Sequence, residues 1–96
     1  MAQINLEIIE NAEKVGRIVE NIQNSNFAVF LEEVNPNKVI PRKISRPDNC
    51  VLAQEVKLKT GLGEKETIQA LNFLVKRGKL DITLKKGYIW YVVCGK

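Results

Sequence analysis

The chain has 96 residues, of which 45% are apolar, so we expect residues 1–96 to form a single domain around one modest core. No apolar run approaches the roughly 20 residues that span a bilayer, and no signal peptide is recognisable, so we expect a cytoplasmic protein without a membrane partner. Histidine is absent and only two cysteines occur, which excludes a zinc site. We expect no metal and no cofactor. An enzyme is also not expected, because no nucleophile stands beside a base and no phosphate-binding glycine loop follows a strand.

The net charge of +4 is unevenly distributed. Residues 1–51 hold six Lys/Arg against seven Asp/Glu, a balance of −1, whereas residues 52–96 hold nine against four, a balance of +5. A basic half favours contact with a phosphate backbone, and a solvated surface is the alternative.

The pattern of residues 5–24 predicts a long first helix. Its apolar residues recur at helical spacing along one face: Ile8, Ala12, Val15, Val19 and Ile22. The polar run from 24 to 26 ends the helix.

Residues 27–49 form a segment that predicts an inserted hairpin or strand-loop-strand. Residues 27–34 and 39–44 are extended in character, and residues 35–38 give a strong turn signal. Pro41 places the second strand of this hairpin at a sheet edge. The segment also carries three basic residues that could contact phosphates: Arg42, Lys43 and Arg46.

After a short strand at residues 50–51, the pattern predicts a second helix at 52–59 and a third at 64–77. Gly61 supplies a left-handed turn between them, with Leu62 as an apolar plug. Gly78 ends the third helix. Residues 80–84 and 88–93 then form a final hairpin, whose tip at 85–87 includes Lys85 and Lys86.

The third helix has a broad apolar arc, which leaves a narrow polar strip. Lys and Arg side chains contact phosphate or guanine, and Gln and Asn pair with adenine, so the strip suits the major groove of DNA. A solvated helix face would look the same. The strip consists of Lys65, Gln69, Asn72 and Lys76.

Two observations weigh against simple DNA binding. Glu64 and Glu66 place negative charge in the first turn, where helices approach phosphates, unless they serve only to stabilise the helix dipole. Ile68 and Phe73 are apolar residues at the border of the strip, so we expect an interface here that covers the helix. The cover could be the insertion, the first helix or a second subunit, and we expect a homodimer.

Residues 60–80, TGLGEKETIQALNFLVKRGKL, resemble the core of the winged helix-turn-helix superfamily, whose members mostly bind DNA. Residues 10–15 and 60–66, together with residues 70–71 and 73–74, are more narrowly similar to a small family of bacterial and archaeal winged-helix domains of unknown function. The likeness covers the first helix and residues 51–93. This chain departs from it through the insertion, and through Leu52 where a Ser or Thr usually caps the second helix. The resemblance implies an α+β winged helix with three helices and a small antiparallel sheet.

The sequence therefore predicts a double-stranded DNA-binding protein, a transcription regulator that uses helix 64–77 and the wing tip at 85–87. The alternative is a protein-interaction or dimerisation module that has the same fold and does not bind DNA. The strand pairing of a winged helix also predicts that Cys50 and Cys94 are near neighbours, as free thiols.

Overall fold

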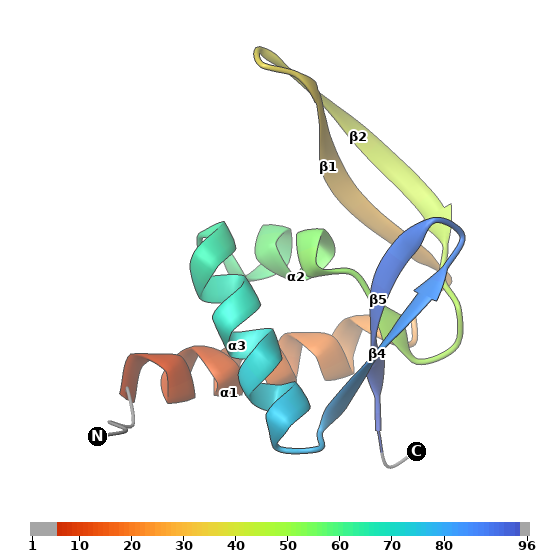
Figure 1. Ribbon diagram of the computed structural model, residues 1–96. Helices are drawn as coiled ribbons and strands as arrows, with labels where there is room; N and C mark the ends of the chain where they lie inside the picture. Colours follow the sequence, from red (N-terminus) through yellow and green to blue (C-terminus); the bar gives the residue numbers. More distant parts are fainter. Residues whose placement is uncertain (1–5, 95–96) are drawn as a thin grey trace.

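The computed structural model describes residues 6–94, which form an α+β arrangement of three helices and two antiparallel sheets (Figure 1). In chain order the elements are α1 (Leu6–Ile22), β1 (Phe27–Asn35), β2 (Lys38–Ser45), β3 (Cys50–Val51), α2 (Ala53–Thr60), α3 (Glu64–Lys76), β4 (Leu80–Lys85) and β5 (Tyr88–Val93). The predicted element types and order are confirmed, and the first two helices differ from prediction by one or two residues at each end. No helix in this part of the chain is long and apolar enough to cross a bilayer.

Local chemistry explains the helix ends. Gly61 follows α2 with φ 76°, a conformation that glycine adopts without steric cost, and its N–H donates to Lys57 O. At the end of α3, the N–H of Gly78 donates to Val75 O and that of Lys79 donates to Leu74 O. These two bonds form a Schellman motif, which explains why the helix ends before Gly78.

The inserted segment is an antiparallel hairpin of β1 and β2, which we call the arm (Phe27–Ser45). It projects away from the helices in Figure 1. The second sheet has the strand order β3-β5-β4. Cys50 pairs with Val92 and Val51 pairs with Tyr91, which confirms the predicted antiparallel pairing of the short strand with the last one.

The two cysteines are free thiols, as predicted, and they are not directly opposite each other in the sheet. Cys50 is opposite Val92 in the sheet, two residues before Cys94, and Cys94 follows the end of β5. Both thiols are free, with Cys50 buried and Cys94 exposed. The two cysteines therefore occupy different environments, and the sheet register does not pair them.

The single core expected from the composition is instead two apolar clusters, one on each face of the β3-β5-β4 sheet. Tyr91 and Val51 face the helices, where Val15, Val56 and Leu71 are fully buried. Adjacent residues of a strand point to opposite faces, so Trp90 lies on the other side, in contact with the arm. That second cluster contains Ala28, Phe30, Cys50, Leu52 and Trp90. Leu62 and Leu74 are only partly buried, at the edge of the helical cluster.

Candidate nucleic-acid interface

The polar strip of α3 is on the surface as one continuous stripe. Lys65, Gln69, Asn72 and Lys76 are all exposed, at the spacing that keeps side chains on one helix face. The opposite face is held in the core by Thr67, Ala70 and Leu71. Burial of that face against α1 and α2 fixes the direction in which the strip points.

The first turn of α3 carries the two carboxylates noted in the sequence. Glu64 is exposed and its Oε1 is 4.0 Å from Lys57 Nζ on α2, a loose surface contact. Glu66 is partly buried. Their negative charge stabilises the positive end of the helix dipole, and it also makes this end less attractive to phosphate.

Ile68 and Phe73 differ in how far they are covered. Phe73 packs at the edge of the helical cluster, and it lines a shallow pocket together with Ile9 of α1. The guanidinium of Arg77 stacks on the ring, with Cζ 5.1 Å from the centroid. The first helix is therefore the element that covers Phe73. Ile68 is 36% exposed and stays available to a partner.

The tip of the β4-β5 hairpin is bound to the arm. Lys86 and Gly87 both have positive φ, 56° and 79°, which is the geometry of a two-residue type I′ turn. Lys86 Nζ donates to Ser45 O at 3.3 Å and to Ser45 Oγ, while Trp90 Nε1 donates to Lys85 O at 2.9 Å. Lys86 is thus engaged within the chain, and Lys85 is the exposed cation at this tip that no such bond holds.

Arg46 is not a phosphate contact, and this corrects the sequence interpretation. Its side chain is 2% exposed and forms an ion pair with Glu55 of α2, whose side chain is 3% exposed. The guanidinium also donates to carbonyl oxygens of Ser25, Phe27 and Cys50. Arg46 therefore joins the loop after α1, the start of the arm, β3 and α2. Its donors are used, and the duplex could not reach them.

The other two basic residues of the arm are exposed and already have neighbours. Arg42 Nη2 lies 3.1 Å from Glu32 Oε2, and Lys43 Nζ lies 4.5 Å above the ring of Phe27. Of the nine residues predicted to contact DNA, five are exposed and have side chains that make no hydrogen bond or ion pair within residues 6–94: Lys65, Gln69, Asn72, Lys76 and Lys85.

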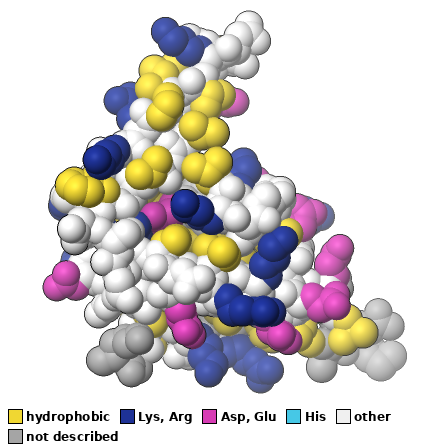
Figure 2. Space-filling view, turned by 180° about the vertical axis from the view of Figure 1, so that it is seen from behind, with side chains coloured by type: hydrophobic (Ala, Val, Ile, Leu, Met, Phe, Trp, Pro, Cys, Tyr) yellow, Lys and Arg dark blue, Asp and Glu magenta, His cyan; other side chains and the backbone are white. Residues whose placement is uncertain are grey.

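Apolar surface is the feature that the sequence interpretation missed. On the arm, Phe27, Val29 and Leu31 are 45–46% exposed and Val39 is 53% exposed. Apolar side chains gather on the projecting arm in Figure 2, between Lys and Arg side chains. The sequence signal was present, because the unbroken apolar run from 27 to 31 supplies both faces of a strand and only one face could join the core.

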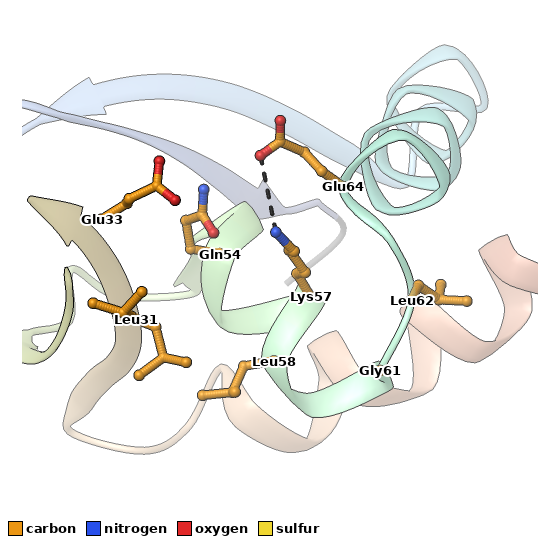
Figure 3. Close-up of a pocket in the computed structure, with 9 residues that line it drawn as sticks. Leu31, Glu33, Gln54, Lys57, Leu58, Gly61, Leu62 and Glu64 are labelled. Carbon is orange, nitrogen blue, oxygen red and sulfur yellow. Dashed lines mark ion pairs between the residues drawn. The ribbon is translucent and has the colours of Figure 1, made fainter. Parts of the chain in front are cut away.

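The exposed face of the arm borders a groove of about 430 Å³ above α2. Leu31 and Glu33 line it from the arm, and Lys57 and Leu58 line it from α2, as Figure 3 shows. Leu58 is 45% exposed. The groove has mixed apolar and charged walls, and it is open to solvent.

Burial raises the pKa of the Cys50 thiol, so the side chain is a neutral thiol at physiological pH. Among the described residues, no three His, Cys, Asp or Glu side chains cluster as metal ligands.

Comparison with known proteins gives no matching family model, no matching curated protein and no matching solved structure. The function is therefore argued from the geometry of this chain.

Proposed function

We propose that this chain is a winged helix-turn-helix protein of the cytoplasm that binds double-stranded DNA and regulates transcription. The order of elements supports the fold: a helix, a short strand, two helices joined by a glycine turn, and a terminal hairpin whose last strand pairs with the short strand. The arm is an insertion into this pattern between α1 and β3.

The observation that carries the proposal is the polar strip of α3. Four side chains able to contact phosphates or base edges form a single exposed stripe, on a helix whose opposite face is packed in the core. Lys85, exposed at the wing tip, supplies an additional cation. Because Arg46 and Lys86 are engaged within the chain, α3 supplies most of the contacts in this proposal.

The test is a titration of the full chain with generic duplex DNA over a range of salt concentrations. Loss of one phosphate contact reduces the slope of log K against log salt by about 0.9, so the variant Lys65→Ala/Lys76→Ala should lower the slope by roughly 2. The charge-matched control is Lys14→Ala/Arg17→Ala, which removes two cations at exposed positions of α1. Equal weakening by the control, or no salt-dependent binding at low salt, would contradict the proposal.

A second function, a protein-interaction module, is favoured by the exposed apolar side chains of the arm. Apolar surface of this kind marks contact sites for proteins more often than contact sites for DNA. The titration separates the two functions, since an interaction module without DNA binding gives no salt-dependent affinity for a duplex.

A further inference from the structure

The exposed face of the arm is polarised along its length. Leu31 is paired with Pro41 near the middle of the hairpin, and Val29 is paired with Lys43 toward the base. Toward the tip, Glu33 is paired with Val39. Paired residues of antiparallel strands share a face, so all six side chains lie on one surface. That surface has a cation at one end, apolar residues in the centre and a carboxylate at the other end.

The two charges stand symmetrically about the centre. Lys43 and Glu33 are each two residues from the Leu31–Pro41 pair, on opposite strands and in opposite directions. Within residues 6–94, Glu33 makes no ion pair, and the nearby cation Lys57 is associated with Glu64 at 4.0 Å. Lys43 Nζ lies over the ring of Phe27 in β1, the strand that also carries Glu33.

From this arrangement we infer that the arm is a homodimerisation surface whose occupant is the arm of a second copy of this chain. A two-fold axis that runs from β1 to β2 through the Leu31–Pro41 pair places the two arms face to face and antiparallel. Lys43 of each copy then meets Glu33 of the partner subunit, and the apolar centres cover each other. A surface that matches itself after a two-fold rotation is what an isologous dimer requires.

The marginal stability of the arm supports the same occupant. An isolated two-stranded hairpin is marginally stable in water and needs either a third strand or a packed face. Ala28 and Phe30 provide a packed face at the base of the arm, next to Trp90. The outer half has exposed Val39 on the same face as Leu31, and the partner's arm would cover it. This inference names the partner for the interaction function proposed above, and it does not depend on DNA binding.

The test uses two single charge reversals of the full chain, Glu33→Lys and Lys43→Glu. Each variant alone places like charges opposite each other at both ends of the interface, so its self-association should weaken by roughly tenfold or more. An equal mixture of the two variants restores opposite charges at both ends. We expect each variant to be a monomer in sedimentation equilibrium and the mixture to form a heterodimer with the mass of the wild-type dimer.

Two matched Leu→Asp variants test which surface forms the dimer. Leu31→Asp should abolish the dimer, while Leu84→Asp, an equivalent change at a 71% exposed position of β4, should leave the mass unchanged. Circular dichroism melting checks that each variant is folded. A wild-type monomer at high micromolar concentration would overturn the inference, as would a mixture that stays monomeric. A dimer that survives both charge reversals but dissociates in Ile68→Asp would keep the interaction function and assign it to α3.

Discussion

The two faces of the β3-β5-β4 sheet are covered in different ways. On one face, three helices pack around Leu71 and Tyr91, and the contacts are almost entirely apolar. On the other face, a single hairpin covers Trp90 with Ala28 and Phe30, and a buried Arg46–Glu55 ion pair fixes its base. The helical face is stabilised by the burial and close packing of apolar side chains. The arm face is smaller, and it combines a few aromatic contacts with one polar anchor.

The largest effect expected from this difference is at Arg46. Replacement with Ala leaves the Glu55 carboxylate buried without its partner, which typically costs about 3–5 kcal/mol of the free energy of unfolding. Arg42→Ala, which removes an exposed pair with Glu32, should cost less than about 1 kcal/mol. Urea denaturation of the two variants measures both. Similar small costs would show that Arg46 does not anchor the arm.

A comparable effect is expected on the helical face at Leu71, which is fully buried. Leu71→Ala should cost about 2–5 kcal/mol, because it leaves a cavity between α1, α2 and α3. Leu74→Ala, at a partly buried site, should cost less, since solvent already reaches the position. A cost below about 0.5 kcal/mol at Leu71 in chemical denaturation would mean that the α3 register is different.

The sequence predicted those features of the fold that are determined locally. Gly61 and Gly78 marked the ends of helices because their positive φ is a property of single residues. The Asn-Pro-Asn turn likewise placed the arm. Contacts between distant parts were not predictable in this way. Arg46 looked like a surface cation, and only the folded chain brings it together with Ser25, 21 residues away, and with Glu55.

The candidate site shows the same division. The strip on α3 follows from helical spacing alone, and all four of its residues are exposed as the spacing predicts. The wing tip depends on tertiary structure. Nothing within the sequence 85–87 indicates that Lys86 would bond to Ser45, because that contact arises from the packing of the arm against β5. The basic cluster was therefore overestimated as a phosphate-binding surface.

The smallest effect concerns Cys50, which is buried where the arm meets the sheet. Desolvation by burial raises its pKa above the ordinary value of 9.0. Above that pH the unfolded chain loses the thiol proton, while the folded chain keeps it up to the raised pKa. The unfolded state therefore binds fewer protons, and the stability that Cys50 contributes is present below pH 9.0 and is lost as the pH rises through the folded pKa.

The experiment compares the pH dependence of unfolding in Cys94→Ser with that in Cys94→Ser/Cys50→Ala. Subtracting the two curves removes other groups, including Tyr91, whose pKa is also raised by burial. We expect the chain that retains Cys50 to lose stability more steeply above pH 9.0 than its matched variant. Parallel curves would show that the thiol is solvated, and that the arm covers its face of the sheet less completely than the helices cover theirs.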